Sequence, residues 1–372
     1  NLTMTKIIIK VKYFSCLLLI LFSCKKHENN LLIKGDIPNL PDGTLFLSKD
    51  NFFDKIDSVK TINGKFEYNY SNKIENEPMY LVLKHIDNEG VFRHIGFKTK
   101  GKFKNAGYES SSFLSDSIIT INGNLIDNTP IGFSSNNKSK MMTVSKEIIA
   151  GYQTNAMFHI DGDLFYYINK DTYIKVASKI KEYPNSFHLL YQINENRNSF
   201  TVSQTKNLLS FFKGEITNSK TFKDLKTYNE KRFNSKKLAL PLLTNNKGKK
   251  TEVFNIKFKK HLVVFWASWC GPCRQEIPAL KNMYSIYKDE VEFVSISTDE
   301  NNSSWQKALE KENMPWKQFI VSEKSKEYEP IEIFFQLSTS IPYIALVDNN
   351  MKVIKSNVGL MTDTEMENFI KN

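Results

Sequence analysis

Apolar and polar residues alternate in three different ways along the 372-residue chain. Residues 31–127 contain short alternating runs that are separated by turn signals. The clearest runs flank Asn63-Gly64 in "DSVKTINGKFEYNY" and Asn122-Gly123 in "DSIITINGNL". Asn-Gly between alternating apolar residues is a strong β-hairpin signal. We therefore expect residues 31–127 to form an antiparallel β domain.

Residues 138–234 change to the spacing of helices. In "DTYIKVASKIKEYPNSFHLLYQI" apolar residues recur every three or four positions, and Pro184-Asn185 interrupts the pattern. The segments "TKNLLSFFKGEI" and "TFKDLKTYNEKRF" continue it. This stretch is expected to form a helical spacer.

Residues 237–372 alternate strands with helices. "HLVVFW" and "VEFVSIS" are continuous apolar strands with a helix-like segment between them, and "YIALVD" and "MKVIKS" predict a hairpin before a closing helix. A βαβ unit followed by a hairpin indicates a mixed sheet covered by helices. The expected fold class is thus multidomain α+β, with an N-terminal antiparallel β domain, a helical middle segment and a C-terminal α/β domain.

Residues 1–23 have the features of an export signal. Lysines precede "YFSCLLLILFS", an apolar stretch of about 11 residues, which is too short to span a bilayer. Its end, "LFSC", resembles the lipobox of bacterial lipoproteins, which implies that Cys24 is acylated. We expect a lipid-anchored protein of the cell envelope that faces the periplasm. The alternative is a plain secretory signal in which Cys24 is incidental.

The composition is that of a globular chain. Hydrophobic residues make up 41% of the sequence, and the formal net charge is +11. The lysines are spread among acidic residues and asparagines rather than gathered on one helix or arm. This pattern argues against nucleic-acid binding.

The cysteine count narrows the chemistry. The chain has four cysteines, of which Cys16 and Cys24 belong to the signal and the lipobox. One close pair, Cys270 and Cys273, remains. Exported proteins that are stabilised by disulfides contain more cysteines than this, so the pair indicates chemistry rather than a structural role. A thiol at a helix N-terminus is stabilised as thiolate by free N–H groups and the macrodipole. Cys270 is therefore expected to attack, and Cys273, one turn further on, to resolve.

Other uses of the pair fit less well. A structural zinc site needs four ligands and no second cysteine pair exists, while His85 and His94 lack partners at metal-ligand spacing. Haem attachment requires histidine where Arg274 stands. A structural disulfide is possible, but so short a loop stabilises a fold little. We expect no metal and no cofactor other than the redox-active disulfide itself.

The segment "VVFWASWCGPC" resembles the active-site motif of thioredoxins, and residues 237–372 are similar to the TlpA/ResA-like branch of membrane-tethered thioredoxins. The resemblance implies a thioredoxin fold and thiol:disulfide oxidoreductase activity. It also implies a cis bond before Pro342, beside which the Ile341 backbone pairs with an extended substrate segment. The substrate-binding residues that it indicates are Trp269, Gly271, Pro272, Ile341 and Pro342.

Glu276 is the acidic residue that the resemblance singles out. Cytoplasmic thioredoxins have a buried aspartate where Val264 stands, whereas TlpA/ResA-like proteins have a glutamate three residues after the second cysteine. This position implies that Glu276 moves protons for the two thiols. The alternative is an exposed acid near the helix N-terminus, where the helix dipole alone stabilises its negative charge.

The function that follows is reduction of disulfides in exported proteins, because Gly-Pro between the cysteines resembles reducing thioredoxins. A membrane thiol carrier would supply the electrons. The rival hypothesis is a ligand- or partner-binding lipoprotein whose thioredoxin module serves only for docking.

Overall fold

The structure is a computed structural model that describes residues 31–49, 55–70, 77–103, 107–115, 118–133, 138–234 and 240–371. The expected signal peptide and Cys24 lie outside these residues. Within the described ranges, no helix combines the length and the apolar character that a membrane span requires.

The N-terminal region is built from two sheets. The smaller has the strand order β4-β1-β9, and the larger has the order β10-β11-β6-β5-β2-β3, with β7 on β6 and β8 on β5. The strands of the smaller sheet are β1 (Leu31–Asp36), β4 (Lys65–Tyr70) and β9 (Ile118–Asn122). Those of the larger are β2 (Gly43–Lys49), β3 (Lys55–Thr61), β5 (Tyr80–Asp87), β6 (Phe92–Phe103), β7 (Gly107–Ser110), β8 (Ser112–Leu114), β10 (Leu125–Asp127) and β11 (Ser139–Val144).

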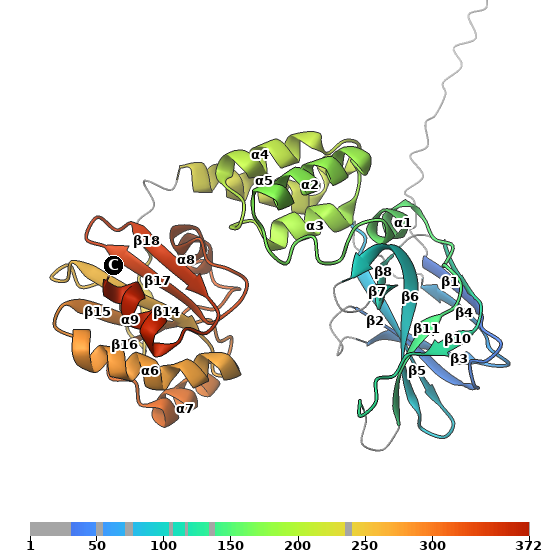
Figure 1. The fold of residues 1–372 in the computed structure, drawn as a ribbon, viewed down its shortest axis with the longest axis horizontal. Helices are drawn as coiled ribbons and strands as arrows, with labels where there is room; N and C mark the ends of the chain where they lie inside the picture. The colour runs from blue at the N-terminus through green and yellow to red at the C-terminus, as the bar shows by residue number, and fades with distance from the viewer. Residues whose placement is uncertain are drawn as a thin grey trace, which may run out of the picture.

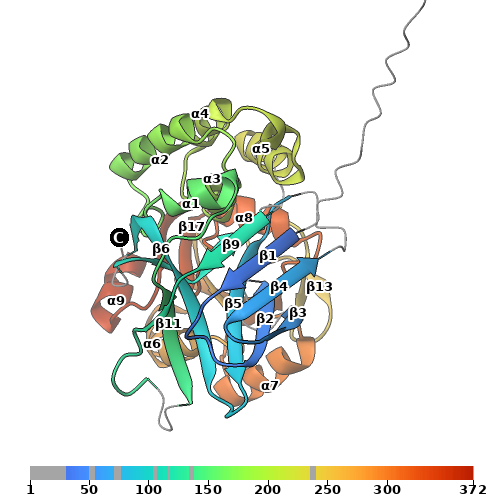
Figure 2. The same cartoon turned by 90° about the vertical axis from the view of Figure 1, so that its right-hand side faces the viewer.

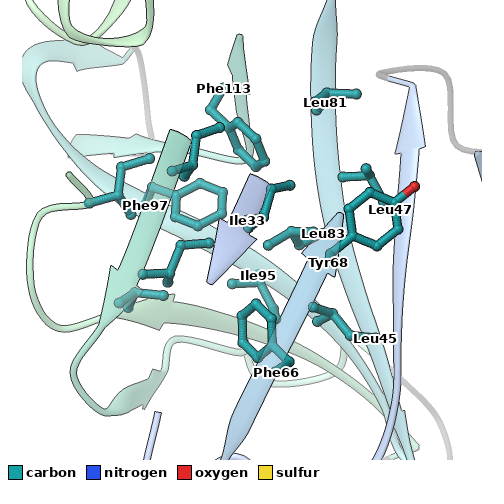
Figure 3. Packing of buried hydrophobic residues seen from close by; sticks show 14 of the residues in the cluster. Ile33, Leu45, Leu47, Phe66, Tyr68, Leu81, Leu83, Ile95, Phe97 and Phe113 are labelled. Carbon is teal, nitrogen blue, oxygen red and sulfur yellow. The ribbon is translucent and has the colours of Figure 1, made fainter. Parts of the chain in front are cut away.

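The two sheets share one apolar core. Alternate residues along the strands point inward, as the period of two in a strand requires. Figure 3 shows side chains from β1, β4, β5 and β6 meeting in this core. The labelled members are Ile33, Leu45, Leu47, Phe66, Tyr68, Leu81, Leu83, Ile95, Phe97 and Phe113.

The two Asn-Gly turns are present, but they do not close hairpins. Asn63 and Gly64 have φ values of 51° and 75°. However, β3 pairs with β2 while β4 pairs with β1, and in the described ranges the two strands are joined by an isolated bridge from Ile62 to Lys65. β9 and β10 likewise pair with different strands. The hairpin predictions were wrong because each turn carries the chain from one sheet to the other.

The expectation of a purely antiparallel domain is also corrected. β1 pairs with β9 in parallel, and β6 pairs with β11 in parallel. Long connections bring these strands back beside earlier ones, which permits parallel pairing.

The middle region is helical, but it begins later than expected. Residues 139–144 form β11, whose pairing with β6 and β10 outweighs the helical spacing of the segment. The helices that follow are α1 (Tyr152–Phe158), α2 (Lys170–Glu182), α3 (Phe187–Glu195), α4 (Val202–Phe211), the 3-10 helix η1 (Glu215–Asn218) and α5 (Lys220–Phe233). The break at Pro184-Asn185 is confirmed, since α2 ends and α3 begins on either side of it.

The C-terminal region is a mixed sheet with the strand order β13-β12-β16-β15-β14-β17-β18. β14 and β15 are parallel and α6 connects them, while β17 and β18 form an antiparallel hairpin, as the sequence pattern predicts. The strands are β12 (Leu243–Asn245), β13 (Lys250–Thr251), β14 (Lys260–Trp266), β15 (Val291–Ser297), β16 (Lys317–Ile320), β17 (Tyr343–Asp348) and β18 (Val353–Val358). The helices are α6 (Gly271–Tyr287), α7 (Asn302–Glu312), α8 (Tyr328–Phe335) and α9 (Asp363–Lys371).

Helices α2 to α5 lie between the N-terminal sheets and the C-terminal sheet along the long axis of Figure 1, and they lie on one side of both in Figure 2. Polar contacts join them to both sides. The Glu77 carboxylate accepts hydrogen bonds from the Thr221 N–H at 2.9 Å and the Thr221 hydroxyl at 2.6 Å. On the other side, Arg197 Nη2 lies 2.7 Å from Glu332 Oε2 on α8.

Candidate active site

Cys270 lies in the connection between the end of β14 and the start of α6. It is the N-cap residue of the helix, in an extended backbone conformation, and the Cys273 N–H donates to its Sγ at 3.2 Å. Pro272 stands in the first turn, where its missing N–H costs no helical hydrogen bond. Cys270 and Cys273 are joined in a disulfide. The sulfur of Cys270 therefore occupies the position that we expected for an activated thiol.

The surroundings of the pair differ strongly in exposure. Cys270 and Cys273 are 4% and 2% exposed, so both are buried in the disulfide form. Trp266 is buried, whereas Trp269 is 71% exposed directly before Cys270, and Gly271 after it is also exposed. An aromatic ring in this place is available to a partner that approaches the disulfide.

The segment that contains Pro342 lies against the disulfide. The Ile341-Pro342 peptide bond is cis, as the resemblance implies. Cys270 Sγ is 3.8 Å from the Ile341 carbonyl oxygen. The Gly359 N–H donates to the Pro342 carbonyl at 2.8 Å, which places the end of β18 beside the same loop. Residues more than seventy positions apart are thus brought together at one end of the sheet.

Glu276 is buried rather than exposed. It is 3% exposed, on the inner side of α6, and its Oε1 accepts a hydrogen bond from the Met361 N–H at 3.0 Å. Its Oε2 has no hydrogen-bond partner among the described residues. Burial raises the pKa of the Glu276 carboxyl, an effect that the Met361 hydrogen bond partly offsets. The alternative of a solvated surface acid is wrong.

Two of the histidines that the structure describes, His261 and His85, form contacts elsewhere in the chain. His261 is buried in β14, where its Nδ1 lies 2.7 Å from Glu292 Oε2. His85 is buried in the N-terminal region, with Nε2 3.0 Å from the Thr61 hydroxyl. In the part of the chain that the structure describes, no group of three or more His, Cys, Asp or Glu side chains could hold a metal ion.

The sequence interpretation missed Asp299, which is 2% exposed and lies behind the active-site turn. Its carboxylate accepts hydrogen bonds from the Ser268 N–H and the Ser268 hydroxyl. The available signal was a cluster of polar residues, "STDE", directly after an apolar strand. In parallel sheets such a position lies at the edge where functional groups gather.

Comparison with known proteins agrees with this geometry. The family model described as Redoxin matches residues 217–370. Thiol-disulfide oxidoreductase ResA of Bacillus thuringiensis subsp. konkukian is 28% identical over 131 residues, which are 35% of this chain and 72% of that protein. Thioredoxin-like protein YneN of Bacillus subtilis is 42% identical over 50 residues, 13% of this chain and 29% of that protein.

Among solved structures, the thioredoxin domain of a thiol-disulfide oxidoreductase from Bacteroides vulgatus is 27% identical, with a TM-score of 0.30 over 35% of this chain and 89% of that one. StoA of Bacillus subtilis is 19% identical, with a TM-score of 0.31 over 36% of this chain and 98% of that one.

The Cys270–Cys273 disulfide, the Redoxin match over residues 217–370 and the ResA relatives together define the class of this region. They support a thioredoxin-like thiol-disulfide oxidoreductase in the C-terminal part of the chain. Among such proteins, this part is similar to the TlpA/ResA-like kind.

Proposed function

We propose that this chain is an exported, lipid-anchored oxidoreductase that reduces disulfides of exported proteins through Cys270. The observation that carries the proposal is the position of the Cys270 sulfur. This sulfur caps α6 and accepts a hydrogen bond from the Cys273 N–H. It also lies near the Ile341 carbonyl oxygen, beside the cis peptide bond. A substrate segment that reaches this sulfur also reaches the Ile341 backbone, with which an extended chain can pair.

The reaction has two exchange steps. The Cys270 thiolate attacks one sulfur of the substrate disulfide, which breaks that bond, forms a mixed disulfide and releases one substrate thiolate. The Cys273 thiolate then attacks Cys270 Sγ and breaks the mixed disulfide. The Cys270–Cys273 disulfide forms, and the second substrate thiolate leaves. Two electrons pass to the substrate, and the enzyme ends in the oxidised form that the structure contains.

Glu276 is proposed to handle the proton of the resolving step. Its raised pKa brings the carboxyl closer to the pH range in which thiols exchange protons. Its free Oε2 has no competing hydrogen bond in the described part of the chain.

The reducing direction is proposed from Gly271-Pro272, the dipeptide of reducing thioredoxins. Electrons for repeated turnover would come from a membrane thiol carrier that reduces the Cys270–Cys273 disulfide. The name of the ResA relatives, thiol-disulfide oxidoreductase, fits either direction of electron transfer.

The location is proposed from the sequence alone. A signal-like segment that ends in "LFSC" supports export and acylation at Cys24, with the protein held at a membrane and facing the periplasm. This placement would bring the active site to disulfides that form outside the cytoplasm.

A disulfide-reduction assay on the purified chain tests the proposal. With a dithiol reductant and insulin as the probe, wild type should accelerate reduction. Cys270→Ser should fall to the uncatalysed rate, and Cys273→Ser should lose turnover. Equal rates for all three proteins would contradict the proposed enzymatic activity. They would favour a thioredoxin module that serves only for docking.

A further inference from the structure

The turn before Cys270 is held by a buried carboxylate on a different strand-to-helix connection. Asp299 Oδ1 accepts from the Ser268 hydroxyl at 2.6 Å, and Oδ2 accepts from the Ser268 N–H at 2.8 Å. A third hydrogen bond, from the Ser297 hydroxyl to Oδ2 at 2.6 Å, fixes the carboxylate itself. Asp299 is 2% exposed, so these bonds are shielded from water.

Further backbone contacts fix the same turn at both ends. The Thr298 N–H donates to the Trp266 carbonyl at 2.9 Å, where β14 ends. The Cys270 N–H donates to the Ala267 carbonyl at 3.0 Å, where α6 begins. Ser268 lies between these two hydrogen bonds, and it is bound in turn to the Asp299 carboxylate. The turn is therefore tied to the end of β15 at its start and at its middle.

We propose that Asp299 is a positioning residue, which holds the Ser268 turn so that the Cys270 sulfur stays at the N-terminus of α6 after the disulfide opens. This inference rests on the proposed attacking role of Cys270. While the disulfide is intact, the bond to Cys273 fixes the Cys270 side chain. Once it is reduced, only the backbone of the turn keeps the sulfur within reach of the Cys273 N–H.

The benefit must come from position rather than from charge. A carboxylate close to the cysteines would disfavour a thiolate, because like charges repel. A hydrogen bond from an N–H to the sulfur favours the thiolate, and this bond depends on geometry. A variant that loosens the turn while it keeps the carboxylate separates the two effects.

Ser268→Ala is that variant. It removes the hydroxyl bond to Oδ1 and leaves Asp299 in place. Ser297→Ala is the comparison variant, because it removes the hydroxyl that donates to Asp299 Oδ2 and accepts from the Asp299 N–H, while both hydrogen bonds between Asp299 and Ser268 stay available.

The experiment measures the iodoacetamide alkylation rate of Cys270 against pH in the reduced full chain, resolved by mass spectrometry. We expect Ser268→Ala to move the midpoint upward and slow alkylation below the midpoint by about threefold, equivalent to half a pH unit. Ser297→Ala should keep the wild-type midpoint. Asp299→Asn, which can still accept from the Ser268 N–H, should stay closer to wild type than Asp299→Ala.

A wild-type midpoint in Ser268→Ala, or the same displacement in Ser297→Ala, would overturn the positioning role. Failure of the proposed function is distinguishable, since it would show in wild type as faster alkylation at Cys273 than at Cys270.

Discussion

Glu276 and Met361 are connected by a hydrogen bond across 85 positions of sequence, from the Met361 N–H to Glu276 Oε1. The bond ties the helix of the cysteine pair to the segment between β18 and α9. It satisfies one oxygen of a buried carboxyl and leaves the other, Oε2, without a hydrogen-bond partner in the described part of the chain. Glu276 is therefore held in place through one carboxylate oxygen, while the other oxygen has no hydrogen-bond partner among the described residues.

Glu276→Gln should change the pH dependence of thiol reactivity while the fold stays intact. The glutamine oxygen can still accept the Met361 N–H, but the side chain can no longer gain or lose a proton. The alkylation profile of the reduced cysteines against pH should lose the contribution of the carboxyl. Glu276→Ala is the comparison, since it removes both the proton site and the hydrogen bond. A profile identical to wild type in Glu276→Gln would return Glu276 to a structural role.

The same residue predicts a pH dependence of stability. Burial raises the pKa of Glu276 in the folded chain above its value in the unfolded chain. Between these two values the folded state binds more protons, so the free energy of unfolding falls as pH rises through that window. Glu276→Gln should remove this fall. Denaturant unfolding of both proteins at pH values from below to above the ordinary carboxyl pKa measures it, and parallel curves would contradict the assignment.

The pair Arg197–Glu332 should stabilise the contact between the helical region and α8. Glu332 is 5% exposed and also accepts from Asn198 Nδ2 at 3.2 Å. Arg197→Met leaves this buried carboxylate without its cation, and we expect a loss of about 3 kcal/mol in the free energy of unfolding. The double variant Arg197→Met/Glu332→Gln should recover part of the loss.

An exposed ion pair serves as the control for that measurement. Lys179 and Glu182 lie 2.9 Å apart on α2, with side chains that are 31% and 50% exposed. Lys179→Met should change the unfolding free energy by less than about 0.5 kcal/mol. Similar losses in the two single variants would contradict a buried contact between the helical region and α8.

Cys24→Ala should release the protein from membranes without changing its disulfide-reduction rate. Acylation would anchor the chain at Cys24, and the described active site lies far along the chain at Cys270. Cell fractionation and assay of both proteins provide the measurement. A variant that stays in the membrane fraction would show that Cys24 is not the anchor.

Local pattern was enough to predict the elements near the cysteines. Continuous apolar strands, an intervening helix and a helix-capping Cys270 are encoded by neighbouring residues, and all are confirmed. The burial of Glu276 and the hydrogen bonds from Ser268 to Asp299 depend on segments that meet only in the folded chain. The N-terminal region shows the same limit, because an Asn-Gly turn fixes local backbone but does not say which sheet the next strand joins.

The central claim is that Cys270 attacks and Cys273 resolves. The most direct measurement is to mix reduced Cys273→Ser and, separately, reduced Cys270→Ser with a protein disulfide such as that of insulin, and to map the trapped mixed disulfide by mass spectrometry. We predict a stable adduct on Cys270 in the first variant and none on Cys273 in the second. An adduct that forms on Cys273 as fast as on Cys270 would contradict this assignment.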